Sequence, residues 1–214
     1  PVGAFEGHLR ALAGRLKDGA LVTDVGSTKA QVVAAGERIL GAGGPFVGSH
    51  PMAGSERRGV GEARPDLFAG ATCILTPTEK TPPALVERAD GLWRALGMRC
   101  LRMAPAEHDR AVARVSHLPH LLAGLLVLLP DDADRAVAAT GFADMTRLAG
   151  GDPEMWRDIV LTNRPAILEA LDAAGAALAQ LRRLVDAGDA AAIQQWLANA
   201  QRRRGHGLGG ATDA

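Results

Sequence analysis

Short apolar segments alternate with helical patterns over the first 104 residues of the chain. The apolar segments are residues 20–25, 45–48, 70–76 and 98–103, and the helical patterns are residues 5–17, 28–40 and 82–96. Strands that alternate with helices are typical of an α/β domain with a mostly parallel sheet. We therefore predict such a domain for residues 1–104.

The pattern changes after Pro105, where only helical segments rich in alanine and leucine follow, without a convincing strand. The predicted helices are residues 106–129 (interrupted or kinked at Pro119), 134–140, a helix opened by Asp152-Pro153, 165–185 and 189–204. A kink is expected at Pro119 because proline has no N–H to donate. We place a domain boundary at residues 104–105 and predict an all-α domain over 105–204, followed by a disordered tail at 205–214.

One stripe of the helix at 165–185 is apolar and needs a partner. Its residues are Leu168, Leu171, Leu178, Leu181, Leu184 and Val185. We predict that this stripe packs both within the chain and across a dimer interface.

Composition excludes several classes of partner and site. Lysine plus arginine equal aspartate plus glutamate, at 24 each, so no overall field favours nucleic acid or an anionic membrane. The apolar run at 121–129 is far shorter than the roughly 20 residues of a membrane helix. Cys73 and Cys100 lie in predicted strands, which is typical of reduced core thiols. With no signal peptide visible, we predict a cytoplasmic protein.

His50 is the first candidate for chemistry. It follows the predicted strand 45–48 and opens the turn-rich segment His50-Pro51-Met52-Ala53-Gly54-Ser55. We therefore predict that His50 lies on a loop at the carboxyl end of a strand, where α/β sheets bind their ligands. An imidazole there could act as a general base or hydrogen-bond acceptor. The alternative is a histidine that only satisfies loop carbonyls.

Ser27 follows the strand at 20–25 and would face the same crevice if the two strands are neighbours. It could hydrogen-bond a substrate hydroxyl or orient His50. The alternative is that Ser27 caps the helix that begins near Thr28. Lys29 is expected to be solvated or packed along its stem, and residues 57–66 are predicted as an exposed loop over the site.

Several polar residues of the helical half are further candidates. His117 and His120 share a helix face with each other, and His108 precedes them on the same predicted segment. They could form a polar substrate wall or serve a structural role; no cysteine or carboxylate cluster converges on them, so we predict no metal. Arg147 has the planar fork that matches a carboxylate, with a surface ion pair as the alternative. Trp156 is predicted in the core.

Together these segments resemble the prephenate/arogenate (cyclohexadienyl) dehydrogenase family of tyrosine biosynthesis. The matching segments are residues 24–29, 48–56, 108–109, 116–120, 146–149 and 155–156, and the fit extends to about Leu197. The resemblance implies a partial Rossmann-type dinucleotide-binding domain joined to an all-helical dimerisation domain, with the active site between them. It also implies a homodimer.

The resemblance further implies oxidative decarboxylation of prephenate or arogenate, with hydride passing to NAD or NADP. His50 would accept a hydrogen bond from the ring hydroxyl, and Ser27 would bridge His50, that hydroxyl and the nicotinamide. Arg147 would hold a substrate carboxylate. The remaining residues of the implied substrate pocket are His108, His117, His120 and Trp156, and the implied cofactor side consists of Gly26, Ser27 and Pro1.

The chain departs from the family at one point, because it contains no G-x-G-x-x-G turn that opens a helix. We therefore expect a fragment that lacks the first part of the nucleotide-binding domain, and poor NAD binding by these 214 residues alone. One alternative is a non-catalytic substrate-binding or dimerisation fragment. Another is a two-domain dehydrogenase of a hydroxy acid; such enzymes use a lysine in the helical half, and none follows Lys80.

Overall fold

The computed structural model describes residues 2–54, 61 and 63–208, and the side chains of these residues up to 205. Contacts divide the chain into two compact units, Pro1–Ala170 and Leu171–Ala214, and each is described by itself. Pro1 lies outside the described residues, as do half of the predicted loop at 57–66 and the last six residues of the predicted tail.

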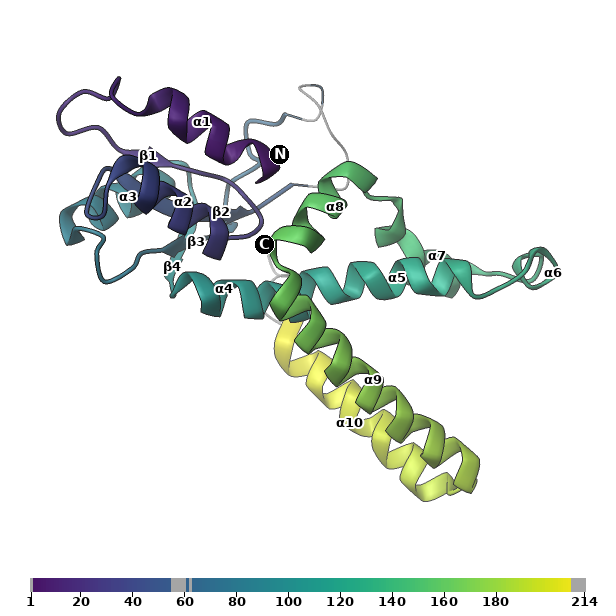
Figure 1. Cartoon of the computed structure of the whole chain (residues 1–214). Helices are drawn as coiled ribbons and strands as arrows, with labels where there is room; N and C mark the ends of the chain where they lie inside the picture. Colours follow the sequence, from purple (N-terminus) through teal and green to yellow (C-terminus); the bar gives the residue numbers. More distant parts are fainter. Residues whose placement is uncertain (1, 55–60, 62, 209–214) are drawn as a thin grey trace. The chain divides into compact units, whose positions relative to one another are not determined.

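The first unit contains a sheet of four strands (Figure 1). The strands are β1 (Val22–Thr23), β2 (Phe46–Met52), β3 (Thr72–Thr76) and β4 (Arg99–Arg102), in the order β1-β2-β3-β4. β1 pairs with β2 and β3 with β4 in parallel, whereas β2 and β3 are antiparallel. The four predicted strands and the mostly parallel α/β class are confirmed.

β2 is longer than predicted, and this changes the setting of His50. β1 pairs only with Phe46 and Val47 at the start of β2. The antiparallel ladder with β3 continues, and His50 lies opposite Ile74 within it. The prediction that His50 lies on a loop is therefore wrong. His50 belongs to the part of β2 that extends beyond the end of β1, so the strand itself fixes its backbone.

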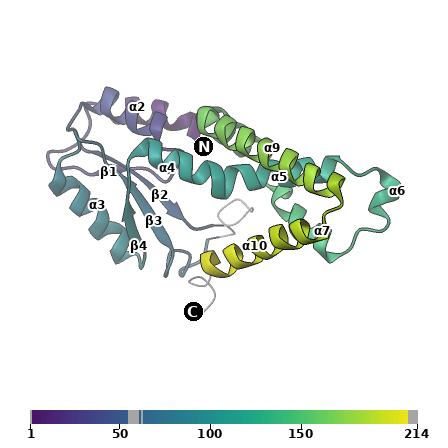
Figure 2. The same ribbon diagram turned by 90° about the horizontal axis from the view of Figure 1, so that it is seen from below.

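Helices cover both faces of the sheet (Figure 2). On one face, α3 (Pro83–Ala95) packs through Leu85, Val86, Ala89 and Trp93 against Val47, Cys73 and Leu75. On the other face, α2 (Ala30–Leu40) and α1 (Phe5–Leu12) share a core with Phe46. Phe46 and Val47 thus point to opposite faces, as consecutive strand residues do. Gly36 on α2 allows this contact, because a Cβ there would lie 2.4 Å from the Phe46 ring.

The rest of the described chain is helical, as predicted. A short 3-10 helix, η1 (Val2–Ala4), precedes α1. The later elements are α4 (Pro105–Val112), the π-helix η3 (Ala113–His117), α5 (Leu118–Leu128), α6 (Asp132–Arg135), α7 (Thr140–Thr146), η4 (Arg147–Gly150), α8 (Pro153–Thr162), α9 (Arg164–Ala187) and α10 (Ala190–Leu208). Within the described residues, α10 continues four residues beyond the predicted end at Arg204, so residues 205–208 are helical.

The predicted interruption near Pro119 is confirmed. The π-helix ends at His117, two residues before Pro119, so the hydrogen-bond pattern changes here while the backbone of His117 and Leu118 stays helical. By length and hydropathy alone, Pro105–Leu128 could cross a membrane, a criterion that core helices of soluble proteins also meet. Here the same stretch carries buried His108, Asp109 and His117. These polar side chains attach it to the rest of the first unit.

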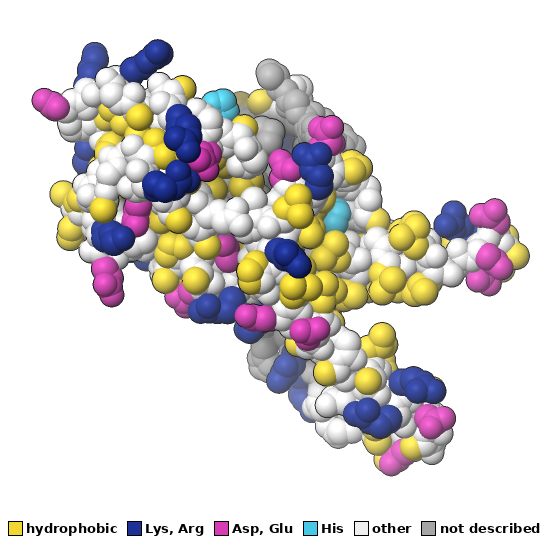
Figure 3. Space-filling model, viewed as in Figure 1, with side chains coloured by type: hydrophobic (Ala, Val, Ile, Leu, Met, Phe, Trp, Pro, Cys, Tyr) yellow, Lys and Arg dark blue, Asp and Glu magenta, His cyan; other side chains and the backbone are white. Residues whose placement is uncertain are grey.

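Both units leave apolar side chains exposed. On α5 these are Leu122, Leu125 and Leu128, and Figure 3 shows hydrophobic side chains gathered along this helix. In the second unit, Leu178 and Val185 of α9 are exposed, as are Trp196 and Leu197 of α10. The apolar stripe predicted on residues 165–185 is therefore only partly covered in the single chain.

Candidate functional site

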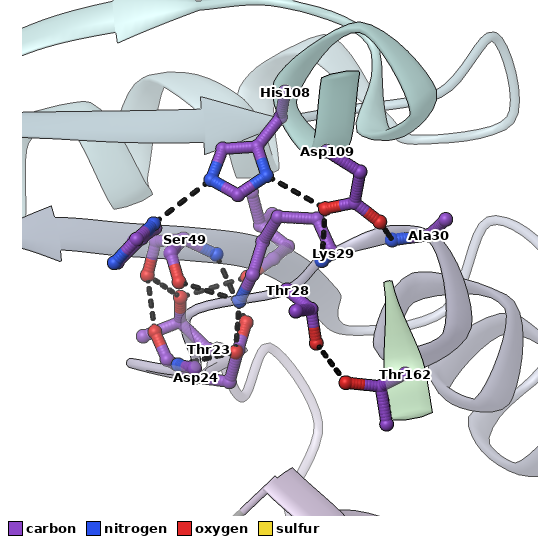
Figure 4. Close-up of polar contacts among 12 residues, drawn as sticks. Thr23, Asp24, Thr28, Lys29, Ala30, Ser49, His108, Asp109 and Thr162 are labelled. Atoms are coloured by element: carbon purple, nitrogen blue, oxygen red, sulfur yellow. Dashed lines mark hydrogen bonds and ion pairs between the residues drawn. The ribbon is translucent and has the colours of Figure 1, made fainter. Parts of the chain in front are cut away.

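A buried ion pair joins the end of β1 to β2 (Figure 4). Lys29 is completely buried; its Nζ pairs with the Asp24 carboxylate and donates to the Ser49 carbonyl oxygen over 2.7 Å. Asp24 also accepts from the backbone N–H groups of Ser49 (3.0 Å) and Gly26 (2.8 Å). Burial lowers the pKa of Lys29, although the charge of Asp24 opposes this shift. Of the two settings expected for Lys29, solvated or packed along its stem, the solvated one is wrong, because the side chain is completely buried.

A carboxylate from the helical half caps α2. The residue before α2, Lys29, makes no side-chain cap, but Asp109 of α4 accepts from the backbone N–H groups of Lys29 (Oδ1, 2.7 Å) and Ala30 (Oδ2, 2.9 Å). A negative charge is favoured at this position because helix N-termini carry unpaired N–H groups and a positive dipole end. Burial raises the pKa of Asp109, but hydrogen bonds from His108, Ala30 and Lys29 outweigh it and leave the pKa lowered.

Ser27 therefore does not cap α2, contrary to the alternative considered from the sequence. The helix begins at Ala30, and Ser27 lies half-buried in the preceding turn. Among the residues that the structure describes, the Ser27 hydroxyl has no hydrogen-bond partner. Gly26 beside it is buried, and a Cβ there would lie 2.8 Å from the Phe5 ring, so a side chain is excluded.

His50 and His108 meet directly. His50 Nδ1 and His108 Nε2 are 2.8 Å apart, with the ring planes at 64°. His108 is completely buried, whereas His50 is half-buried. Burial is the largest cause that lowers the pKa of His50 to about 3, followed by the electrostatic effects of the neighbouring His108 and Lys29. His50 is thus neutral at physiological pH, the form that can accept a hydrogen bond or a proton.

The other predicted histidines lie around Trp156. His120 stacks on the Trp156 ring at a centroid distance of 3.5 Å, and His117 meets the same ring edge-on at 5.9 Å. Gly151 lets the chain approach this group, because a Cβ there would lie 2.5 Å from Trp156 Nε1 and 2.8 Å from His120 Cε1. Burial lowers the pKa of His117 to about 4 and also lowers the pKa of His120.

Asn163 connects the two histidine groups. Its Nδ2 donates to the backbone oxygen of Asp109 over 2.8 Å and contacts His117 Nδ1 at 3.1 Å. Asn163 is 2% exposed, so both contacts are shielded from water. The structure therefore brings His50, His108 and His117 into one connected network within the first unit.

Arg147 is not part of this buried network. It is exposed and begins η4, which packs against α5. Its role toward a substrate carboxylate stays a prediction, as does the role of the Ser27 hydroxyl. Across the described part of the chain, no group of three histidine, cysteine, aspartate or glutamate residues could hold a metal ion.

Sequence reasoning missed three polar residues of this site: Asp24, which bonds to Lys29 and Ser49, and Asp109 and Asn163, which contact the histidines. A usable signal was present for one pair: Asp24 ends a strand and Lys29 precedes a helix, so one apolar-flanked turn carries two opposite charges. Asp109 and Asn163 lie 54 positions apart, and no local pattern joins them.

The histidine network predicts acid-sensitive stability. In the folded state the pKa of His50 is about 3 and that of His117 about 4, both below the unfolded value near 6.5. Below about pH 6.5 the unfolded chain therefore binds more protons than the folded chain. As the pH is lowered from there, the free energy of unfolding should fall by up to about 1.4 kcal/mol per pH unit for each of these two histidines. The charged groups facing His50 are Lys29 and Asp109, with His108 and His117 beside them.

Urea denaturation between about pH 5 and pH 8 measures this dependence. His50→Gln should reduce the slope below about pH 6.5, whereas His8→Gln, at an exposed position of α1, should not. An unchanged slope in His50→Gln would show that His50 already carries a proton, or has an ordinary pKa, in the folded protein.

The chain is similar to known proteins over nearly its whole length. Residues 1–102 match the family model "Prephenate dehydrogenase, nucleotide-binding domain" and residues 104–199 match "Prephenate dehydrogenase, dimerization domain". Prephenate dehydrogenase of Bacillus subtilis is 40% identical over 176 residues, which are 79% of this chain and 47% of that protein. Cyclohexadienyl dehydrogenase of Zymomonas mobilis is 32% identical, over 95% of this chain and 72% of that protein.

Solved structures give the same result. Prephenate dehydrogenase from Aquifex aeolicus, in complex with hydroxyphenyl propionate and NAD+, is 34% identical with a TM-score of 0.88, over 95% of this chain and 73% of that one. Synechocystis arogenate dehydrogenase is 30% identical with a TM-score of 0.85, over 95% and 75% of the two chains. The chain spans about half the length of the Bacillus subtilis relative and of a Lactococcus lactis one (47% and 53%). It belongs to the prephenate dehydrogenase family.

Proposed function

We propose that the protein containing this chain oxidatively decarboxylates prephenate or arogenate, as a cytoplasmic step of tyrosine biosynthesis, with hydride transfer to NAD or NADP. The main support for the proposal is the setting of His50. Its imidazole is neutral and half-buried, it is hydrogen-bonded to His108, and it lies near the end of β2 beside the β1–α2 turn. Relatives that are prephenate, cyclohexadienyl and arogenate dehydrogenases support the substrate class.

The proposed chemistry begins at the ring hydroxyl of the substrate. His50 accepts the hydrogen bond and then the proton of this hydroxyl while hydride leaves the same carbon. The carbon–carboxylate bond then breaks, its electron pair enters the ring, and carbon dioxide and an aromatic product result. The bound NAD or NADP supplies the hydride acceptor. Since aromatisation drives the reaction, the protein mainly has to orient the ring and shield the site from water.

In this proposal the turn between β1 and α2 contacts both the substrate hydroxyl and the nicotinamide of the cofactor. Ser27 is half-buried there with a hydroxyl that is not committed to another described residue, so it can bond to the substrate hydroxyl and the nicotinamide. Gly26 keeps the turn free of a side chain next to it. Arg147 is proposed to pair with a substrate carboxylate, while His117, His120 and Trp156 provide a wall of rings.

The test follows the absorbance of reduced nicotinamide after addition of prephenate or arogenate, each with NAD and with NADP. It uses the protein expressed from its whole reading frame, beside the 214-residue chain alone. We expect turnover of at least one substrate by the former, and poor NAD binding by the latter. A folded protein that binds NAD or NADP but oxidises neither substrate would contradict the proposal.

We also propose that the protein is a homodimer. The match of residues 104–199 to a dimerisation domain and the exposed Leu178 and Val185 on α9 support it. Replacing both residues by glutamate should convert the dimer to a monomer, because buried carboxylates without partners oppose association. Light scattering after size exclusion gives the mass. Exchanging Arg182 and Arg183 of the same helix for glutamine is the matched control, and a dimer that survives the glutamate variant would place the interface elsewhere.

A further inference from the structure

Three side chains form a continuous hydrogen-bonded chain from the N-terminus of α2 to the proposed active site. Asp109 Oδ1 is 2.8 Å from His108 Nδ1, and His108 Nε2 is 2.8 Å from His50 Nδ1. Asp109 and His108 are buried, and the strand β2 holds His50. We propose that Asp109 is a positioning residue that acts through His108 to fix His50 in the tautomer with its proton on Nδ1 and a lone pair on Nε2.

The first step concerns Asp109, which can only accept. Backbone N–H groups donate to both of its oxygens, from Lys29 to Oδ1 and from Ala30 to Oδ2. These hydrogen bonds favour the charged form and leave the pKa of Asp109 lowered, so the carboxyl is ionised. An ionised carboxylate has no hydrogen to offer, and His108 Nδ1 must therefore be the donor in the bond between them.

The second step derives the tautomer of His50 from the hydrogen on His108 Nδ1. A neutral imidazole carries its hydrogen on one nitrogen only, so His108 with a hydrogen on Nδ1 has a lone pair on Nε2. We infer that His108 is the neutral ring, since a charged ring would instead donate from both of its nitrogens. His50 Nδ1 must then donate to His108 Nε2, and His50 Nε2 is left as the acceptor. This part of the inference rests on the proposed function, in which that nitrogen accepts from the substrate hydroxyl.

The same network predicts the opposite tautomer for His117. Asn163 Nδ2 donates to the Asp109 backbone oxygen, which can only accept, so this atom is the amide nitrogen. It therefore also donates to His117 Nδ1 at 3.1 Å, and the hydrogen of neutral His117 lies on Nε2. His117 is an internal reference within one spectrum.

Long-range ¹H–¹⁵N correlation spectra of the histidine-labelled protein at about pH 8, where imidazole is usually neutral, distinguish the tautomers directly. We expect the hydrogen on Nδ1 in His50 and His108 and on Nε2 in His117. A hydrogen on His50 Nε2, or a charged His108, would overturn the proposal. This measurement needs only the wild-type protein, so the tautomers can be determined even if a variant fails to fold.

Two variants test whether Asp109 and His108 set the tautomer of His50. Asp109→Ala and His108→Phe should both produce His50 with its hydrogen on Nε2, while His117 keeps its tautomer because Asn163 and the backbone oxygen remain. In Asp109→Ala, kcat should fall at least about tenfold with little change in KM, whereas Glu107→Ala at an exposed position of α4 should leave both unchanged. A His50 tautomer that persists in His108→Phe would show that another group sets it.

The spectra and the kinetics separate failure of this inference from failure of the proposed function. If His50 has the expected tautomer but neither prephenate nor arogenate is oxidised, the function is wrong and the role of Asp109 is structural. If the substrate is oxidised while wild-type His50 carries its hydrogen on Nε2, the function stands and Asp109 is not the positioning residue.

Discussion

Replacing Lys29 by methionine should lower the free energy of unfolding by about 3–5 kcal/mol. Methionine fills a similar volume but leaves the Asp24 carboxylate buried without its cation, and the Ser49 carbonyl loses a donor. An uncompensated buried charge is among the most destabilising single changes in a protein. Urea denaturation followed by circular dichroism measures the loss as a lower midpoint.

Lys80 is a matched control for this effect. It pairs with Glu37 at 3.4 Å but is 64% exposed, so Lys80→Met should cost less than about 1 kcal/mol. Adding Asp24→Asn to Lys29→Met should recover part of the loss, because the double variant no longer leaves an unpaired carboxylate buried at position 24. Equal costs for Lys29→Met and Lys80→Met would mean that the buried pair contributes no more than a surface pair.

The order of strands and helices could be predicted because it depends on local periodicity. All four predicted strands exist, since the apolar runs around Val22, Val47, Leu75 and Leu101 fill strand positions next to helices. The antiparallel direction of β3 was not predicted. A signal was nevertheless present, because residues 53–70 show no helical pattern and a parallel neighbour needs a crossover, usually a helix.

The candidate site could be predicted only in part. The histidines were found because imidazole is rare and chemically distinctive, and His50 and His108 do meet. Their supports were not found, because the bond from Asp109 to Lys29 spans 80 positions of the chain. Burial of a lysine also contradicts the average behaviour of this residue type, so no composition rule could place Lys29 in the core.

The setting of His50 illustrates the same limit in the backbone. Pro51 and Gly54 suggested a turn-rich loop directly after the strand, and yet β2 continues through Pro51 to Met52. Proline lacks one donor but is compatible with a strand at positions where its N–H is not needed. The extension of β2 past β1 is a tertiary property, because it depends on where the partner strand ends.

Replacing His50 by asparagine should have the largest effect on activity. Asparagine can still bond to His108 but cannot take a proton, so kcat for prephenate or arogenate should fall by about 10²–10⁴ while KM changes little. The loss should appear throughout the neutral range, because burial and the electrostatic effects of His108 and Lys29 lower the His50 pKa to about 3. Initial rates of nicotinamide reduction, with the protein expressed from its whole reading frame, provide the measurement.

Variants at His8 and Trp156 serve as controls for this experiment. His8→Asn changes an exposed histidine of α1 and should leave kcat and KM at wild-type values. Trp156→Phe keeps a ring against His120 and should affect KM more than kcat, because an aromatic wall binds the ground state and the transition state alike. A His50→Asn protein that folds and retains activity within about threefold would remove His50 from the mechanism, since a general base contributes far more than that.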